Sequence, residues 1–350
     1  MSTHQLYMHR CMELALSGAG NVAPNPMVGA VLVHNNKIIG EGYHQKYGQA
    51  HAEVNCLNSV AEEHKHLIPS ATLYVSLEPC AHYGKTPPCA DLIIRYGVRQ
   101  VIIGCRDPFE MVNGKGIEKL LAANIEVVAG VLEQECIQLN KKFFTYHQQK
   151  RPYVILKWAE TSNKVMGGLD GSQLKISSYV SDRLVHKWRS EEAGILIGTN
   201  TALNDDPQLN NRLWNGNSPI RIVIDLQRRL PAALKIFDDS QPTIVFNYKE
   251  EKEDGLTSFK RLVPGNPVCM QILSACYQLN ITSILIEGGA HTIQSFINEG
   301  LWDEARVICN NDLIVEKGVA SPELYYQQFI KREQYLNDTI SYYQPVKTNP

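Results

Sequence analysis

The sequence predicts two consecutive α/β domains, and three observations lead to this fold class. Short apolar runs rich in β-branched residues alternate with segments of helical pattern along the whole chain. The length of 350 residues exceeds that of most single domains. A polar stretch around Phe143 to Pro152 interrupts the alternation and ends in a proline, which cannot continue a helix. We place the boundary at about residue 148, which gives domains 1–148 and 149–350.

The first domain is expected to be a sheet with helices packed on its faces. Its apolar runs are short and bounded by turn residues, which is typical of buried strands. The expected strands are Ala30–Val33, Thr72–Leu77, Val101–Cys105 and Ile125–Ala129. The expected helices are Ala52–His64, Cys89–Tyr96 and Gly116–Asn124.

The second domain repeats this alternation. Its expected strands are Tyr153–Trp158, Gly194–Gly198, Ile220–Asp225, Thr243–Phe246, Ile284–Glu287 and Glu304–Cys309. Its expected helices include His291–Glu299 and Tyr179–Glu192, the latter with Ser177 or Ser178 as N-cap. The tail after Leu324 is rich in Tyr and Gln, and the pattern assigns no element to it.

Composition and charge argue against several classes of protein. The 34 Lys and Arg residues against 36 Asp and Glu give a net charge of −2, whereas proteins that hold long nucleic acids usually carry a basic excess. The first residues lack the basic-then-apolar pattern of a secretory signal, and no apolar run approaches the ~18 residues of a membrane helix. The nine scattered cysteines do not resemble a disulfide framework. We therefore expect a cytoplasmic protein that binds neither nucleic acid nor membrane.

Three short motifs of the first domain combine the ligands of a catalytic zinc site. His51-Ala-Glu53 opens an expected helix, a Pro-Cys80 pair follows an expected strand, and a Pro-Cys89 pair opens another helix. One imidazole and two thiolates suit Zn²⁺, and three protein ligands leave its fourth position open to water, which then loses a proton near neutral pH. Glu53 can exchange protons with that water without binding the metal. Each motif alone is common, but together and in this order they are typical of zinc-dependent nucleobase deaminases.

The spacing of the two cysteines narrows the comparison. Eight residues separate Cys80 from Cys89, where the general deaminase signature has two. The segment Cys80-Ala-His-Tyr-Gly-Lys-Thr-Pro-Pro-Cys89 resembles the riboflavin-biosynthesis deaminases. Pro24-Asn-Pro-Met-Val-Gly29, Gly42-Tyr-His44 and His51-Ala-Glu53 resemble other motifs of the same family.

This resemblance implies a fold, a substrate and substrate contacts. The domain would have the three-layer α/β/α fold of the cytidine deaminases. Its substrate would be 2,5-diamino-6-ribosylamino-4(3H)-pyrimidinone 5′-phosphate, a small-molecule pyrimidine ribosyl phosphate that loses its 2-amino group as ammonia. By position in the motifs, the substrate contacts would be Asn25, His44, His82 and Lys85. Lys85 would act as a mobile positive charge for polar groups or phosphate.

The strongest local feature of the second domain is Glu287-Gly-Gly289, where an expected strand ends and an expected helix begins. Backbone N–H groups at a helix start can bind a phosphate, and glycine permits its close approach. The same pattern also fits a tight turn without a ligand. No segment here matches Gly-x-Gly-x-x-Gly, so a Rossmann domain lacks its main evidence.

Several segments of the second domain resemble the reductase, of dihydrofolate-reductase-like fold, that is often fused to riboflavin-biosynthesis deaminases. In chain order they are Lys157-Trp-Ala159, Ile176-Ser-Ser178, His186-Lys-Trp-Arg-Ser190, Gly198-Thr-Asn-Thr201, Asp205-Asp-Pro207 with Leu209 and Arg212, and Glu287-Gly-Gly289. The resemblance implies that NADPH reduces the ribosyl group to ribityl, with hydride delivered to C1′ while the protein supplies orientation and charge.

Roles carry over to individual positions of the second domain. The implied substrate contacts are Arg189, Asp205, Leu209, Arg212 and Glu287. The implied NADPH contacts are Ala159, Lys175, Thr201, Gly289, Ala290, His291, Thr292, Ile293, Gln294 and Ser295. The chain departs from the family pattern where the usual Ser-Leu-Asp-Gly reads Thr161-Ser-Asn163-Lys164, and where Lys175 replaces a tryptophan.

Four hypotheses follow. The first is a bifunctional deaminase–reductase, expected to be a homo-oligomer with a dimer favoured. The second is a deaminase whose second domain only binds substrate or dimerises. The third is a structural zinc protein that binds nucleic acid, which needs a basic face and a fourth protein ligand, for which His82 is a candidate. The fourth is a cytidine or tRNA deaminase, against which the cysteine spacing and the second domain argue.

Overall fold

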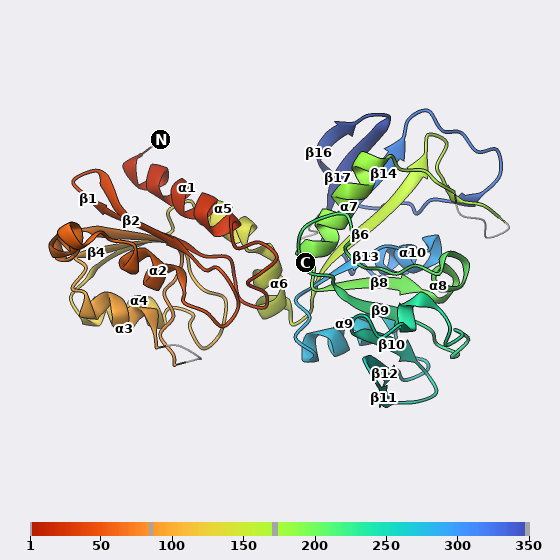
Figure 1. The fold of residues 1–350 in the computed structure, drawn as a ribbon, viewed down its shortest axis with the longest axis horizontal. Helices are drawn as coiled ribbons and strands as arrows, with labels where there is room; N and C mark the ends of the chain where they lie inside the picture. The colour runs from red at the N-terminus through yellow and green to blue at the C-terminus, as the bar shows by residue number, and fades with distance from the viewer. Residues whose placement is uncertain (1, 84–86, 170–173, 347–350) are drawn as a thin grey trace. The chain divides into compact units, whose positions relative to one another are not determined.

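The computed structural model describes residues 2–83, 87–169 and 174–346. Its contacts divide the chain into two compact units, residues 1–150 and 151–350, and each is described by itself (Figure 1). Within the described ranges, every helix is too short or too polar to cross a lipid bilayer.

The described part of the first unit is built on one five-stranded sheet with the order β2-β1-β3-β4-β5. Its strands are β1 (Gly29–His34), β2 (Lys37–Tyr43), β3 (Thr72–Leu77), β4 (Gln100–Cys105) and β5 (Glu126–Ala129). Strand β1 pairs antiparallel with β2 and β3, whereas β3, β4 and β5 run parallel. The carboxyl ends of β3 and β4 therefore lie side by side. Cys80 follows the end of β3 by three residues.

Helices cover both faces of this sheet and complete three layers (Figure 1). They are α1 (Thr3–Leu16), α2 (Ala52–Asn58), α3 (Cys89–Arg95), α4 (Lys115–Ala122), α5 (Glu133–Leu139) and α6 (Lys141–Gln149), with a 3₁₀ helix η1 (Glu62–Ser70). Residues of α2, α3 and α4 pack with one face of the strands, and residues of α1, α5 and α6 pack with the other. The sheet is thus apolar on both sides, as its continuous hydrophobic runs require.

Two segments of this unit differ from what the sequence pattern suggests. The prediction of one helix over Ala52–His64 was wrong: α2 ends at Asn58, and Ser59 is its C-cap, with its hydroxyl donating to the Cys56 carbonyl. The division between the two units, after Lys150, falls inside the predicted break around Phe143 to Pro152, but the first part of that stretch is helical: it belongs to α6, whose Phe144, Thr145 and Tyr146 are buried. A polar helix with a narrow buried face resembles a linker when only its average polarity is considered.

A two-residue turn joins β1 to β2. Asn35 and Asn36 have φ of 47° and 61°, and His34 pairs with Lys37, as in a type I′ hairpin. Asn tolerates this left-handed conformation better than Ala does, and Gly adopts it without strain.

We expect Asn36→Ala to lower the free energy of unfolding by about 1 kcal/mol. Asn36→Gly should leave the free energy of unfolding unchanged or raise it. Urea unfolding measures both, and equal losses in the two variants would contradict the turn assignment.

The described part of the second unit is built on a ten-stranded sheet with the order β11-β12-β10-β9-β8-β13-β6-β14-β17-β16. Its strands are β6 (Tyr153–Thr161), β8 (Gly194–Gly198), β9 (Ile220–Ile224), β10 (Thr243–Asn247), β11 (Lys252–Asp254), β12 (Thr257–Arg261), β13 (Ser283–Ile286), β14 (Glu304–Asn310), β16 (Gln327–Tyr335) and β17 (Asp338–Pro345). A short pair, β7 (Val165–Gly167) with β15 (Val319–Ala320), lies apart. Neighbouring strands from β12 to β14 run parallel, so their carboxyl ends share one edge.

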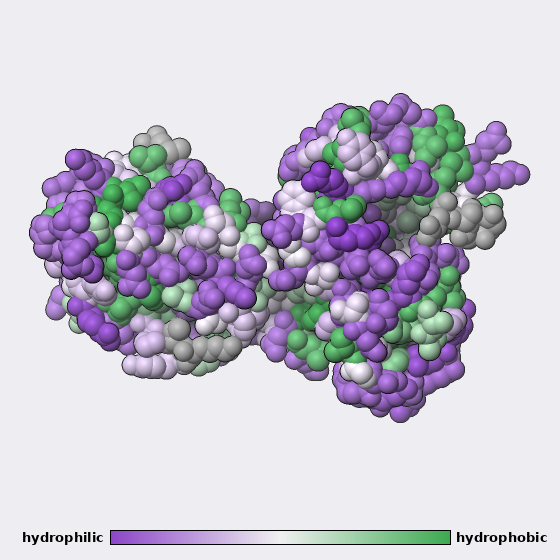
Figure 2. Space-filling view, viewed as in Figure 1, coloured by the Kyte–Doolittle hydropathy of each residue, from purple (hydrophilic) through white to green (hydrophobic). Residues whose placement is uncertain are grey.

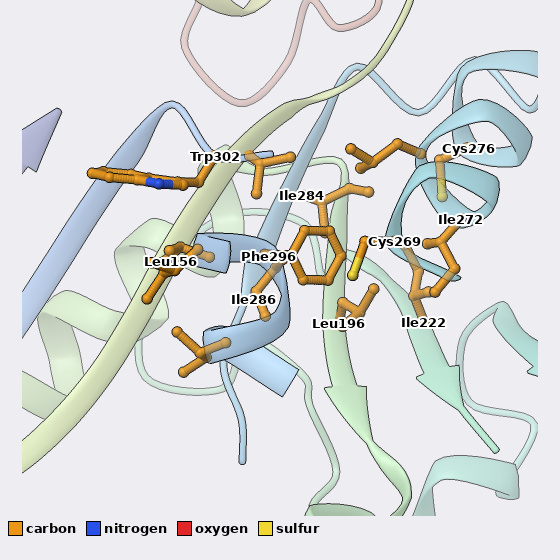
Figure 3. Packing of buried hydrophobic residues seen from close by; sticks show 14 of the residues in the cluster. Leu156, Leu196, Ile222, Cys269, Ile272, Cys276, Ile284, Ile286, Phe296 and Trp302 are labelled. Carbon is orange, nitrogen blue, oxygen red and sulfur yellow. The ribbon is translucent and has the colours of Figure 1, made fainter. Parts of the chain in front are cut away.

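Helices again cover both faces of the sheet. They are α7 (Tyr179–Glu191), α8 (Thr199–Asp205), α9 (Val268–Gln278) and α10 (Ala290–Asn298), with a 3₁₀ turn η2 (Lys235–Phe237). Figure 3 shows the largest core, in which Cys269 and Ile272 of α9 and Phe296 of α10 face Leu196 and Ile284 of the sheet. Helix α7 packs on the opposite face through Val185 and Trp188. Ser178 caps α7 by accepting a hydrogen bond from the Ser181 N–H at 3.4 Å.

The tail that carried no assignment forms the last two strands of the sheet. Strand β17 pairs with β14 and buries Ile340, and β16 forms the exposed edge. Its pattern was hard to recognise because β16 buries almost none of its side chains. Figure 2 shows hydrophilic residues over most of the drawn face of each unit, with smaller hydrophobic groups between them.

Candidate active sites

The backbone brings the three expected zinc ligands together at one end of the first sheet. His51 is the N-cap residue of α2, Cys80 follows β3, and Cys89 is the first residue of α3. Their ligand atoms all lie within 4.8 Å of one another. Three loops that are far apart in sequence therefore converge because α2 and α3 both begin beside the carboxyl end of β3.

The atoms at this centre fit a zinc ion. His51 Nδ1 lies 3.3 Å from Cys89 Sγ and 3.6 Å from Cys80 Sγ, and the Cys89 N–H donates to Cys80 Sγ at 3.3 Å. The hydrogen bond from the Cys89 thiol and the interaction with His51 stabilise the Cys80 thiolate. Burial acts in the opposite direction, but the net effect lowers the pKa of Cys80 to about 4. A thiolate is the form that binds metal. One imidazole nitrogen and two sulfurs are a zinc donor set with room for a fourth ligand.

Glu53 lies beside this centre on the first turn of α2. It is 3% exposed and is not one of the three clustered ligands. Burial raises the pKa of its carboxyl above the ordinary value, and the charge of the Cys80 thiolate acts in the same direction. A carboxyl group with a raised pKa beside the three clustered ligands is suited to taking up and releasing a proton.

Asn25 and His44 form a hydrogen-bonded chain that ends at the loop before His51. Asn25 Nδ2 lies 3.2 Å from His44 Nε2, and His44 Nδ1 lies 3.1 Å from the Ala50 carbonyl. In this arrangement Nδ1 carries the proton and Nε2 accepts from the amide. Burial lowers the pKa of His44, so its ring stays neutral, and it meets the His51 ring edge-on at 5.3 Å. Both predicted substrate contacts therefore adjoin the metal centre.

His82 and Lys85 belong to the loop between the two cysteines. The His82 ring lies 5.8 Å from the Phe109 ring, and its buried Nδ1 has no hydrogen-bond partner among the described residues. Lys85 lies outside the described residues. An unpartnered nitrogen at the site is available to a ligand, because buried polar atoms normally have partners.

Sequence reasoning missed Glu78, which fixes the strand end that carries Cys80. Its buried carboxylate accepts hydrogen bonds from the N–H groups of Asp107, Gly114, Gly116 and Ile117 at 2.9–3.3 Å. These bonds tie the loop after β4 and the start of α4 to the end of β3. The signal was a charged residue at the end of an apolar strand, directly before Pro79-Cys80.

The second unit holds a cleft of about 1170 Å³ along the carboxyl edge of β6, β13, β8 and β9. It is lined at its centre by Gly288, Gly289 and the start of α10. The predicted cofactor contacts that line it are Ala159, Lys175, Thr201, Gly289, Ala290, His291, Thr292 and Ser295. Ile293 points into the apolar core instead, and the Gln294 side chain bonds to Glu323 and Asn298.

The features of this cleft fit a dinucleotide. Gly289 has φ of 61°, and a Cβ at Gly288 or Gly289 would press against Thr201. The chain can therefore turn from β13 into α10 close to the cleft only without side chains at these positions. Ala290, His291 and Thr292 at the start of α10 line the cleft. The first N–H groups of a helix have no partner within the helix, so this start is suited to a pyrophosphate.

Arg189 and Glu287 form an ion pair beside the cleft. Arg189 Nε and Nη2 each donate to a carboxylate oxygen of Glu287 at 2.8 Å. Lys157, which the sequence reasoning did not assign, lines the cleft with its Nζ 3.6 Å from Glu287 Oε2. Burial alone would raise the pKa of Glu287, but the two cations lower it to about 2. The group is thus an anion at any physiological pH.

The other predicted substrate contacts of this unit lie in different surroundings. Asp205 lines the cleft at the end of α8. Leu209 is 3% exposed and packs in a separate apolar cluster with φ of 52°. Arg212 is exposed, and its backbone N–H donates to His186 Nδ1 at 3.1 Å. Among the described atoms of these three residues, only those of Asp205 border the cleft.

The structure explains the departures from the family pattern. Lys164 has φ of 65°, a conformation that favours the glycine usual at this position, and its Nζ pairs with the buried Glu160. Asn163 Oδ1 accepts from the Thr161 hydroxyl at 2.7 Å and the Val315 N–H at 3.2 Å. Lys175 pairs with Asp182 at the edge of the cleft. These residues form contacts of their own and leave the cleft open.

Comparisons with known proteins match each of the two units to a protein family. The family model described as cytidine and deoxycytidylate deaminase zinc-binding region matches residues 1–105, and the RibD C-terminal domain matches residues 152–314. Fold and sites together define a bifunctional enzyme, a zinc-binding deaminase joined to a reductase. The first relative, riboflavin biosynthesis protein RibD of Aquifex aeolicus, is 42% identical over 85% of this chain and 84% of its own. The chain belongs to this RibD family of riboflavin biosynthesis.

Solved structures extend the likeness to the whole chain. A diaminohydroxyphosphoribosylaminopyrimidine deaminase/5-amino-6-(5-phosphoribosylamino)uracil reductase from Thermotoga maritima has a TM-score of 0.89 and 34% identity, covering 98% of this chain and 99% of its own. RibD of Acinetobacter baumannii has a TM-score of 0.89 and 31% identity with the same coverage. The predicted deaminase-like and dihydrofolate-reductase-like folds are confirmed, as is the deaminase–reductase role. These matches to the reductase domain and to whole deaminase–reductase chains do not favour the deaminase-only alternative.

Proposed function

We propose that the chain catalyses two consecutive steps on one pyrimidine. The first hydrolyses the 2-amino group of 2,5-diamino-6-ribosylamino-4(3H)-pyrimidinone 5′-phosphate. The second uses NADPH to reduce the ribosyl group of the resulting aminouracil to ribityl. The observation that carries the proposal is the meeting of His51, Cys80 and Cys89 beside the buried Glu53. The likeness to the Thermotoga enzyme over the whole chain supports the choice of substrate.

In the deaminase site, His51 Nδ1 and the sulfurs of Cys80 and Cys89 hold the zinc ion. When bound, zinc supplies a Lewis acid that makes water acidic enough to react near neutral pH. Glu53 accepts a proton on its carboxylate and delivers it to the departing amino nitrogen, which leaves as ammonia. Its burial keeps bulk water from competing for that proton.

Four residues orient the pyrimidine in this site. The neutral His44 and the Asn25 amide present fixed polar groups beside His51, since each already has one partner that sets its direction. His82 offers its unpartnered Nδ1. Lys85 would bind the substrate phosphate or another polar group through its positive charge.

In the reductase site, the residues of the Gly289–Ser295 segment that line the cleft would hold NADPH, with the first N–H groups of α10 available to its pyrophosphate. The cofactor supplies a hydride for C1′ of the sugar. Ala159, Lys175 and Thr201 line the cofactor side. Asp205 and Glu287 face the substrate from the cleft, and Arg189 holds Glu287 in place. Leu209 and Arg212 do not border the cleft, so they would contact the substrate only where it extends beyond the cleft. We also propose that the enzyme is a homodimer.

Metal removal tests the assignment of the first step. Chelation should abolish ammonia release, because without zinc no group in the site activates water, and NADPH-dependent reduction of the deaminated substrate should continue. Added Zn²⁺ should restore ammonia release, and metal analysis should give one zinc per chain. Normal ammonia release from protein shown to lack metal would refute the zinc site. A Cys89→Ala variant offers a second readout, since it should lose stoichiometric zinc.

A further inference from the structure

The cleft of the second unit extends well beyond the groups that the proposed reduction uses. Along the sheet edge, the strands follow in the order β9-β8-β13-β6. Adjacent strands lie about 4.8 Å apart, so the ends of β9 and β13 are separated by about 10 Å. Helix α10 begins after β13, and the cleft continues from there past β8 to the loop after β9, where Leu226, Gln227 and Arg229 line it.

The chemistry of that far end is cationic. In Rossmann domains that use NAD, an acidic side chain binds the ribose 2′-hydroxyl, whereas a nearby arginine accommodates a 2′-phosphate. The same charge preference applies to a 2′-phosphate in a cleft of another fold, because Arg pairs well with phosphate. Asp225 is the acid nearest to the end of β9, but it is fully buried. Its two carboxylate oxygens accept the N–H groups of Arg229 and Leu230 at 3.0 Å each. The Asp225 carboxylate therefore stabilises the backbone of the loop after β9, and it does not line the cleft.

The two neighbouring arginines of this loop have different surroundings. Arg228 donates to Glu250 at 2.7 Å and lies over the Phe259 ring, away from the cleft. Arg229 is exposed and lines the cleft, where its Nη2 donates to Asn200 Oδ1 at 3.3 Å. No carboxylate pairs with Arg229 among the residues that the structure describes. Its charge is therefore available to an anion in the cleft.

We infer that Arg229, positioned by Asn200, binds the 2′-phosphate of NADPH and makes the reductase prefer NADPH to NADH. This inference rests on the proposed reductase function and adds its specificity-determining residue. From the start of α10 the cleft reaches toward β9 on one side, and toward Lys157 of β6 and Glu287, which directly follows β13, on the other. A nucleotide whose pyrophosphate is held at the start of α10 would therefore place its adenosine half toward β9. Arg suits phosphate because it can donate two parallel hydrogen bonds while carrying a permanent charge.

The test measures nucleotide binding to the zinc-loaded full chain rather than turnover. Dissociation constants for NADPH and NADH are obtained from nicotinamide fluorescence, and those for 2′,5′-ADP and 5′-AMP by calorimetry. Arg229→Gln should weaken binding of NADPH and 2′,5′-ADP by about 10- to 100-fold, as expected for loss of one charge-assisted contact. NADH and 5′-AMP should bind within about twofold of the wild type, and Arg229→Lys should restore part of the NADPH affinity.

Arg228→Gln is the matched control, because it removes the same charge one residue away without changing the cleft. It should leave the ratio of NADH to NADPH dissociation constants within about twofold of the wild type, and thermal unfolding verifies that each variant folds. The inference is overturned if Arg229→Gln weakens NADPH and NADH equally, or if the wild type binds both equally well; the proposed reductase then still stands. If the wild type binds neither nucleotide, the reductase proposal fails as well.

Discussion

Replacing Glu53 by Gln should reduce ammonia release by about 10³-fold, within the 10²- to 10⁴-fold range of general acid–base catalysis. The amide has nearly the same shape, but it cannot accept a proton from water or give one to the amino nitrogen. Zinc content should remain one per chain, because Glu53 is not one of the clustered ligand residues. Ammonia production in a coupled assay and metal analysis of the same sample provide both numbers.

The second unit supplies an internal control for this variant. Reduction of the deaminated substrate with NADPH should proceed at the wild-type rate, since Glu53 and the cleft belong to different units. If Glu53→Gln deaminates normally, the proton-transfer role is wrong. If the variant instead loses its zinc, Glu53 contributes to metal binding and not only to chemistry.

Replacing Glu287 by Ala should have the largest effect on the second unit. It leaves Arg189, whose side chain is 14% exposed, without its bidentate partner. Removing one member of a buried ion pair costs about 3–5 kcal/mol of folding free energy. The reductase should be inactive in this variant, while ammonia release from the first unit continues. Urea unfolding monitored in the second unit, together with both activity assays, measures these effects.

An exposed pair gives the matched comparison. Glu253 accepts from Lys260 at 2.8 Å on the surface, with its side chain 67% exposed. Glu253→Ala should change the free energy of unfolding by no more than about 1 kcal/mol, because water and salt screen such pairs. If Glu253→Ala and Glu287→Ala lower the free energy of unfolding equally, the buried pair stabilises the fold no more than the exposed pair does.

The same buried pair predicts a dependence of stability on pH. The pKa of Glu287 falls from the ordinary 4.5 to about 2 in the folded state. A carboxyl group with a lowered folded-state pKa stabilises the fold above its unfolded pKa, and this contribution is lost as the pH falls. The second unit should therefore lose stability between pH 4.5 and 2, and Glu287→Gln should show a shallower loss over that window.

The sequence predicted the parts of this protein that depend on local pattern. Strand β3 has the predicted bounds, and the zinc centre could be recognised because His51, Cys80 and Cys89 each sit at the start or end of an apolar element. The positions of such ligands in a sequence are strongly restricted, because three side chains must reach one zinc ion.

What the sequence could not predict depends on contacts between distant segments. Glu78 has no recognisable partner in sequence, because its partners are backbone N–H groups of residues 107–117. Lys157 and Arg229 resemble ordinary charged residues until the sheet order brings β6, β13, β8 and β9 to one edge. Strand β16 escaped notice because an exposed edge strand lacks the apolar alternation that identifies a half-buried one.

The central claim is that one chain first deaminates and then reduces the same pyrimidine. The most direct measurement follows ammonia and NADPH together, with zinc-loaded protein and 2,5-diamino-6-ribosylamino-4(3H)-pyrimidinone 5′-phosphate. We predict ammonia release without NADPH, and NADPH consumption that begins only after ammonia appears and reaches one equivalent of it. Absence of ammonia from zinc-loaded protein, or oxidation of NADPH before any ammonia forms, would contradict the account.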